Sequence, residues 1–270
     1  MPDMFSLLIT FLMTLIAGFA LLLVYGRTRQ VERYRQLSGQ LHNLADPGIP
    51  KLEPWATSAV PSFEQHLVAL HDSLPVALFT RLQTIALACS TGERSYVPGH
   101  KQGSTVAYAD LIEQAPELAA LYQSDGLREL VTRIVGQSVQ PTPLHDQSSC
   151  SLLIYTRPGD HIGWHYDHNF YRGAHFTVLL SLCNEGPGGL SSTRLQIRQD
   201  GVERTIATPP NTLVIFQGAK VLHRTTRLQA GEQRILLSMT FCADPRNNWL
   251  QGTLRRLKDT AYFGLRALWT

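Results

Sequence analysis

The sequence lacks the features that mark several classes of protein. Of its 270 residues, 17% are charged, the formal net charge is only +3, and the basic residues form no long block. Proteins that bind nucleic acids usually concentrate positive charge, so no nucleic-acid partner is expected. The chain also contains no internal repeat and no low-complexity tract, and a repeat architecture is therefore not expected.

Cysteine is scarce as well. The chain has 4 cysteines, and no two of them form a CxxC pair. A disulfide framework is typical of much smaller secreted domains. Three of the four lie in or beside apolar runs, so we expect buried, reduced thiols that behave as small hydrophobic side chains.

Charge is completely absent from residues 5–25, FSLLITFLMTLIAGFALLLVY. A helix of this length spans about 30 Å, the thickness of the hydrocarbon core of a bilayer. A cleaved signal peptide would have a positive segment before a shorter apolar stretch, whereas Asp3 is the only charged side chain before this run. The run therefore predicts a retained single-pass transmembrane anchor.

Basic residues follow this run, and nothing comparable precedes it. Arg27, Arg29, Arg33 and Arg35 all lie just after residue 25. Positive charge accumulates on the cytoplasmic side of membrane proteins, so the domain that follows is predicted to be cytoplasmic. That compartment is reducing, in agreement with the interpretation of the cysteines.

The first half of the remaining chain has a helical pattern. Residues 26–60 are basic, then rich in proline, and predict a juxtamembrane linker. Residues 61–143 predict a helical support region, with helices within 62–90, 106–123 and 125–138. Pro75 is expected to start a second helix within 62–90, because proline is tolerated in a first helical turn. The polar stretch 91–104, TGERSYVPGHKQGS, is predicted to be a loop.

The pattern changes to short strands between residues 144 and 244. Gly- and Pro-containing turns separate β-rich runs, which is typical of a jelly-roll-like barrel. Together with the helices this predicts an α+β fold. The expected strands are 149–156, 175–183, 193–199, 202–208, 212–217 and 233–242.

Residues 245–270 predict a C-terminal amphipathic helix. Leucines recur at steps of three or four, and Arg255, Arg256 and Lys258 share the same stretch. Such a helix can lie in the membrane interface. A helix that simply packs on the barrel is the other interpretation, and the sequence favours it.

Three side chains form a candidate metal site. His165 and Asp167 are two apart in YTRPGDHIGWHYD, so on an extended chain they leave the same face. His223 follows another predicted strand and can supply the third ligand. Two imidazoles and one carboxylate leave positions open for a bidentate co-substrate and dioxygen on ferrous iron. Zinc can use similar ligands for hydrolysis.

Arg234 and Tyr155 are candidates for binding a co-substrate. Arg234 lies inside the apolar strand QRILLSMTF, where an unpaired charge is costly to bury. It is expected to pair with a carboxylate such as the distal one of 2-oxoglutarate. An arginine at a sheet edge with its end in solvent is the alternative. The Tyr155 hydroxyl can reach the same carboxylate, or Tyr155 is an ordinary core residue.

The segments YTRPGDHIGWHYD, GPGGL and NTLVIFQGAKVLHRTTRLQAGEQRILLSMTF resemble the prolyl 4-hydroxylase-like branch of the 2-oxoglutarate and Fe(II)-dependent oxygenases. The resemblance covers about residues 150–243. It implies a double-stranded β-helix, iron ligands at His165, Asp167 and His223, and a 2-oxoglutarate anchor at Arg234. Many prolyl hydroxylases have lysine at that position, which weakens transfer of the proline substrate. Asp167 argues against the halogenase variants, which lack this carboxylate.

The resemblance implies a dioxygenase that couples oxidation of 2-oxoglutarate to hydroxylation of a substrate. Its cofactor is Fe(II), its co-substrates are dioxygen and 2-oxoglutarate, and ascorbate is a candidate auxiliary reductant. The substrate is unidentified, either a protein side chain or a lipid, and the anchor favours one associated with the membrane. A non-catalytic jelly-roll binding module and a zinc-dependent hydrolase are the alternatives.

Overall fold

A computed structural model of the chain describes residues 4–44, 61–89, 92–97, 99–264 and 267. The helices are α1 (Met4–Leu44), α2 (Val76–Ala88), α3 (Tyr108–Gln114), α4 (Pro116–Gln123), α5 (Asp125–Val135) and α6 (Trp249–Phe263). The strands are β1 (Leu67–Leu70), β2 (Glu93–Val97), β3 (Lys101–Val106), β4 (Gln140–Pro141), β5 (Cys150–Tyr155), β6 (His161–His165), β7 (His175–Glu185), β8 (Leu195–Gln199), β9 (Val202–Ile206), β10 (Thr212–Phe216), β11 (Leu222–Thr225) and β12 (Gln233–Cys242).

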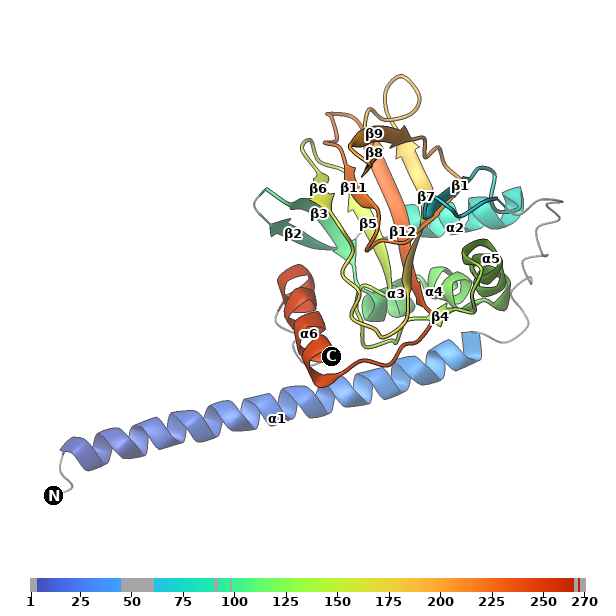
Figure 1. Cartoon of the computed structure of the whole chain (residues 1–270). Coiled ribbons are helices and arrows are strands. Elements are labelled where there is room, and N and C mark those ends of the chain that lie inside the picture. Colours follow the sequence, from blue (N-terminus) through green and yellow to red (C-terminus); the bar gives the residue numbers. More distant parts are fainter. Residues whose placement is uncertain (1–3, 45–60, 90–91, 98, 265–266, 268–270) are drawn as a thin grey trace.

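The strands form one antiparallel, barrel-like sheet, as a jelly-roll core requires. Their order is β1-β10-β7-β12-β5-β3-β6-β11-β8-β9, with β2 paired to β3 and β4 paired to β12. The sheet folds over at β3, which pairs with β5 on one side and with β6 on the other. The layer β10-β7-β12-β5 therefore faces the layer β6-β11-β8-β9 (Figure 1).

Alternation along the strands separates the core from the barrel interior. On β12, Leu237, Met239 and Phe241 point toward the helices and join the main hydrophobic core. The residues between them, Leu236, Ser238 and Thr240, line the interior cavity. Successive side chains of a strand leave opposite faces, so this one strand builds both environments.

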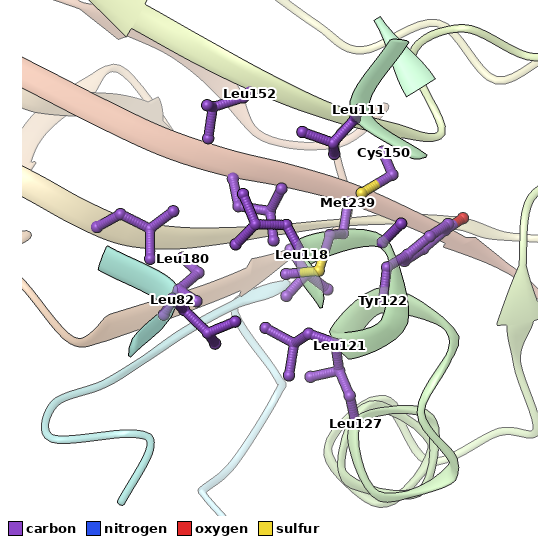
Figure 2. Close-up of a cluster of buried hydrophobic side chains, with 14 of the residues drawn as sticks. Leu82, Leu111, Leu118, Leu121, Tyr122, Leu127, Cys150, Leu152, Leu180 and Met239 are labelled. Carbon is purple, nitrogen blue, oxygen red and sulfur yellow. The ribbon is translucent and has the colours of Figure 1, made fainter. Parts of the chain in front are cut away.

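Helices α2 to α5 cover the outer face of this layer. Figure 2 shows Leu82 of α2 and Leu118 and Leu121 of α4 packed with Leu180 of β7 and Met239 of β12. Cys150, Cys183 and Cys242 are buried and free, and Cys89 is half-buried and free. The predicted reduced thiols are confirmed for these four positions.

Several predicted boundaries need correction. Residues 91–104, predicted to be a loop, contain most of a β2–β3 hairpin, whose register runs from Glu93↔Thr105 to Val97↔Lys101. The helical support region thus also contributes β1, β2 and β3 to the sheet. The predicted helix 106–123 is two helices, because Pro116 begins α4 and Ala115 breaks the helical backbone. Pro75 does precede a helix, since α2 begins at Val76, but the first helix predicted within 62–90 is wrong, because Leu67–Leu70 form β1.

The first helix is longer than the predicted anchor. Residues 26–44 of the expected juxtamembrane linker continue α1, and residues 45–60 lie outside the described part of the chain. The end of α1 docks on the domain: Leu37 is buried in the main core, and the Arg33 guanidinium lies 2.7 Å from Asp110 and 2.9 Å from Glu113.

The beginning of α1 projects away from the domain with its apolar side chains exposed (Figure 1). By length and composition, α1 is able to cross a membrane. An apolar helix near the N-terminus is also typical of a signal sequence. Among the described residues, no other helix meets this criterion.

The C-terminal helix α6 packs on the barrel, but not through its leucines. Arg255, Asp259 and Phe263 are its buried residues, and the Arg255 guanidinium lies 2.9 Å from the Asp259 carboxylate. The leucine stripe of the sequence pattern points outward instead, as Leu250, Leu254 and Leu257 are all exposed. The amphipathic helix is confirmed as a helix over Trp249–Phe263, with its charged face against the protein.

Candidate functional site

The candidate site forms where β6 and β11 pair. His223 is directly opposite His165 in the antiparallel register, and Asp167 follows two residues after the end of β6. The Oδ1 atom of Asp167 lies 3.5 Å from Nε2 of His165 and 3.7 Å from Nε2 of His223. One ligand atom from each residue falls within 4.8 Å of the others, so the group is able to hold a metal ion.

Backbone carbonyls fix the orientation of both imidazoles. Nδ1 of His165 lies 2.8 Å from the carbonyl oxygen of Gly163, and Nδ1 of His223 lies 2.9 Å from that of Val221. A carbonyl only accepts, so each Nδ1 carries the proton and donates it. The Nε2 atom of each ring then carries a free lone pair, which a histidine needs in order to bind a metal. Both lone pairs are directed toward the Asp167 carboxylate.

Two partners that the sequence did not reveal hold Asp167. The Thr177 hydroxyl of β7 donates to Oδ2 over 2.5 Å, which leaves Oδ1 for the imidazoles. The Asp167 amide donates to the carbonyl of Gly218, in the turn after β10. A side chain at residue 218 would collide with the carboxylate, because a Cβ there would lie 2.3 Å from Oδ2 of Asp167.

The charges of the three residues are coupled. Burial raises the pKa of Asp167, but the imidazoles of His223 and His165 and the Thr177 hydroxyl outweigh it and hold the pKa well below its usual range. Burial lowers the pKa of His165, but Asp167 outweighs it, so the net pKa is raised. Burial dominates for His223, and its pKa is lowered. Asp167 is thus an anion at neutral pH and able to balance a cation.

Arg234 and Tyr155 lie side by side on the facing layer of the barrel. They are partners in the register of β12 and β5, and Arg234 is 0% exposed. The Arg234 guanidinium donates to the Thr193 carbonyl over 3.3 Å and to the Thr208 hydroxyl over 3.1 Å. Burial lowers the pKa of Arg234 to about 10.

Several polar atoms in this corner have no hydrogen-bond partner. They are Nε of Arg234, the hydroxyl of Tyr155 and the hydroxyl of Thr193, all buried. Among the described residues, no carboxylate pairs with Arg234. A buried guanidinium and two buried hydroxyls that remain unsatisfied are costly, and a bound carboxylate would satisfy them. The residues therefore fit the distal end of 2-oxoglutarate.

A cavity of about 370 Å³ lies between the two layers and reaches the three ligand side chains. Its floor includes Leu236, Leu153 and Ile162, which pack beside Tyr155. His168 and His175 line the cavity without joining the ligand group, and His161 neither lines it nor joins that group. His100 and Lys101, in the stretch predicted to be a loop, and His168, just after Asp167, contribute to its wall.

Lys101 is a cavity residue that sequence reasoning missed. It begins β3, lines the cavity and is only 5% exposed. Burial, together with the nearby charge of Lys258, lowers its pKa to about 8. A lysine in a stretch rich in glycine and serine resembles a solvated residue, and no pattern in the sequence marks it as buried.

Comparison with solved structures identifies this architecture. The carbocyclase SnoK of nogalamycin biosynthesis, titled non-heme and alpha ketoglutarate dependent, superposes with a TM-score of 0.56 at 15% identity, over 76% of this chain and 92% of that one. A 2OG-Fe(II) oxygenase family protein from Burkholderia pseudomallei gives 0.55 at 13% identity, over 69% and 89%. The chain has the fold of the 2-oxoglutarate and Fe(II)-dependent oxygenases. The fold expected from the resemblance is thereby confirmed.

This oxygenase fold includes prolyl hydroxylases. One from Trichoplax adhaerens, in complex with a hypoxia inducible factor peptide fragment, gives a TM-score of 0.53 at 12% identity, over 80% of this chain and 92% of that one. The family described as HalD, Halogenase D, matches residues 69–181, which is less than half of the chain. No curated protein matches the sequence. At these identities the comparisons establish the fold alone, and the reaction has to be inferred from the residues of the site.

Replacing Gly218 by alanine tests the Asp167 position. The added methyl group displaces the carboxylate, so Gly218→Ala should raise the Kd for Fe(II) by about 10- to 100-fold, as loss of support around a metal ligand commonly does. Gly188→Ala is the matched control, since a Cβ there meets nothing within 4 Å. Anaerobic calorimetric titration measures both. Equal affinities in the two variants would contradict the placement of Asp167 at the metal.

Replacing Lys101 by methionine tests its buried charge. Its pKa of about 8 lies below the value of 10.5 for a free lysine, so the unfolded chain binds more protons between these pH values and stability should rise there. Lys101→Met removes a penalty of about 3 kcal/mol that is fully present below pH 8.

The free energy of unfolding, measured by urea denaturation in detergent, should therefore be higher for Lys101→Met at pH 7 and converge with wild type above pH 10. Lys220→Met, at an exposed lysine, should change it by no more than about 0.5 kcal/mol. A lower stability of Lys101→Met at pH 7 would show that the buried charge is compensated in the folded protein.

Proposed function

We propose that the protein is a 2-oxoglutarate- and Fe(II)-dependent dioxygenase that hydroxylates its substrate. The observation that carries this proposal is the shared geometry of His165, Asp167 and His223, whose free nitrogen and oxygen lone pairs meet at one point inside an oxygenase fold. Iron with bound 2-oxoglutarate supplies the oxidising chemistry that inserts one oxygen atom of dioxygen into a C–H bond.

In this proposal His165, Asp167 and His223 are the iron ligands. Arg234 binds the distal carboxylate of 2-oxoglutarate, and the Tyr155 hydroxyl donates to the same group. The three buried polar atoms without partners at Arg234, Tyr155 and Thr193 support these roles. Leu236, Leu153 and Ile162 shield the methylene groups of the co-substrate from water.

Two other chemistries are less consistent with the site. A zinc hydrolase needs a bound water but no buried guanidinium, so Arg234 would have no role. Halogenation is suggested by the Halogenase D match over residues 69–181. However, the Asp167 carboxylate occupies the position in which the halogenases bind halide, so hydroxylation is the favoured outcome.

We also propose that α1 anchors this enzyme in a membrane and that its substrate is membrane-associated, either a lipid or a protein. The exposed apolar side chains of α1 before residue 26 support the anchor. Basic residues after the anchor support a cytoplasmic catalytic domain. Of these, Arg33 also binds Asp110 and Glu113, so it links the anchor to the domain.

Anaerobic titration of the full chain with Fe(II) and 2-oxoglutarate tests the activity. A weak visible charge-transfer band should appear, and succinate should form when oxygen is admitted, also in the absence of chloride and bromide. His165→Ala should lose the band and the succinate.

Arg234→Met should raise the Kd for 2-oxoglutarate by at least about 30-fold, since removal of one partner of a buried charge pair is costly. Arg204→Met, at an exposed arginine on β9, is the matched control and should leave it unchanged. Hydrolysis without succinate, or turnover only with halide, would contradict the proposal.

A further inference from the structure

Lys101 is a buried cation that lines the cavity, whereas Arg234 is not among the lining residues. Nζ of Lys101 donates to the Thr105 hydroxyl over 2.9 Å and lies 4.9 Å from the centre of the Tyr262 ring. Among the described residues, no carboxylate lies within ion-pair distance of Lys101. A buried ammonium group with one hydroxyl partner has two donors left for a ligand.

The carboxylates near this wall already have partners. Asp146 accepts from the Tyr171 hydroxyl over 2.7 Å and lies 3.8 Å from Nζ of Lys258. Asp259 pairs with Arg255 and Lys258. The wall that carries Lys101 therefore holds uncompensated positive charge, which is unfavourable in a protein interior unless an anion binds there.

Lys101 and Arg234 lie in different parts of the barrel. The charge of Lys258 affects the pKa of Lys101. Different groups, the Tyr155 hydroxyl and the charge of Arg194, affect the pKa of Arg234. Lys101 lines the cavity together with His165, and it pairs with Ile162 of β6, the strand that carries His165. The lysine is thus beside the ligand group on the β3 and α6 side, while Arg234 lies on β12.

We propose that Lys101 binds an anionic oxygen group of the substrate, a carboxylate or a phosphate, and so selects acidic substrates. This inference rests on the proposed function, in which Arg234 takes the co-substrate. A dioxygenase of this kind needs one cation for 2-oxoglutarate. Lys101, which lines the cavity together with the metal ligands, is then available to hold the substrate.

The 4 lysines of the chain make a direct test possible. The full chain, labelled with ¹⁵N-lysine and loaded with zinc in place of iron, is titrated with 2-oxoglutarate and then with inorganic phosphate or butanoate at constant ionic strength. The ammonium resonance lost in Lys101→Met should shift saturably with either anion, and that of Lys220 should not.

Calorimetry should show phosphate binding weakened about tenfold or more in Lys101→Met, as expected for loss of a hydrogen bond to a charged group. Binding of 2-oxoglutarate should stay unchanged. A Lys101 resonance that responds to 2-oxoglutarate alone would make this lysine the co-substrate anchor and overturn the inference, as would no response to any anion. Failure of 2-oxoglutarate to bind at all would instead refute the proposed function.

A separate observation concerns the outer face of α6. Its exposed apolar stripe consists of Trp249, Leu250, Leu254 and Leu257, with Trp249 82% and Leu257 55% exposed. The stripe is turned away from the domain because Arg255, Asp259 and Phe263 of α6 are buried against it. A helix of a water-soluble protein normally has the opposite arrangement.

The same helix lies close to α1 just beyond its apolar run. A small cleft is lined by Gln30 and Arg33 of α1 together with Phe263 of α6, and Tyr34 lies near Arg255 and Asp259. Gln30 is five residues after Tyr25, or about 8 Å along the helix, which is comparable to the headgroup layer of a bilayer. Figure 1 shows α6 running across α1 rather than along it.

We infer that the apolar stripe of α6 lies in the membrane interface, beside the anchor. This inference rests on α1 spanning the bilayer. Trp249 at one end of the stripe is the side chain type that favours this depth, and helices of this pattern lie in the plane of the interface. Lys258 and Tyr262 on the other face of α6 line the cavity, so the active site would open close to the membrane surface.

Quenching by brominated lipids tests this placement. The emission of Trp249 is obtained as the difference between the full wild-type chain and Trp249→Phe in liposomes, and lipids brominated on their acyl chains should quench it. The emission of Trp164, obtained in the same way from Trp164→Phe, should not be quenched, because the guanidinium groups of Arg198 and Arg224 lie over its ring.

Unquenched, red-shifted emission from Trp249 in a chain that stays with the liposomes would overturn the inference. Emission that is blue-shifted, unquenched and dependent on protein concentration would show that a second copy covers the stripe, and would also overturn it. Release of the whole chain from liposomes by alkaline carbonate would refute the anchor itself.

Discussion

The Asp167 carboxylate is the group on which the site depends. It lies between two imidazoles that come from paired strands, and it is fixed by a hydroxyl from a third strand and by a backbone contact at Gly218. Without this anion, two partly buried imidazoles would face each other with ring centres 4.1 Å apart. Each support comes from a different part of the barrel, so the geometry exists only when the two layers are correctly closed.

Closure of the barrel in turn depends on strands that serve two environments. β12 supplies Leu237 and Met239 to the core under the helices and Leu236 and Ser238 to the cavity. At the beginning of β12, the same alternation places Arg234 inside the barrel, opposite Tyr155 of β5. The helices that bury one face of this strand therefore also hold the guanidinium in position. The buried cations are costly to the fold, and their retention is typical of sites that exchange stability for binding.

Much of this arrangement follows from local sequence rules. Runs rich in branched and aromatic residues between turns gave the main strands, and the spacing of two between His165 and Asp167 placed them on one side of the chain. The β2–β3 hairpin was missed because its residues are polar and lack alternation. Lys101 was missed because burial depends on α6, which is more than a hundred residues away. An amphipathic pattern shows which side of a helix is apolar, but only the tertiary structure shows which side is covered.

The unbroken course of α1 has a mechanical consequence. From Met4 to Leu44 the helix has no interruption, and its second half is fastened to the domain by Leu37 and Arg33. The barrel domain is thus joined to residues 4–25 by one continuous helix, with no hinge between Met4 and Leu44. Whatever holds residues 4–25 also sets the height and the tilt of the cavity, so the cavity can reach only molecules that lie at that height.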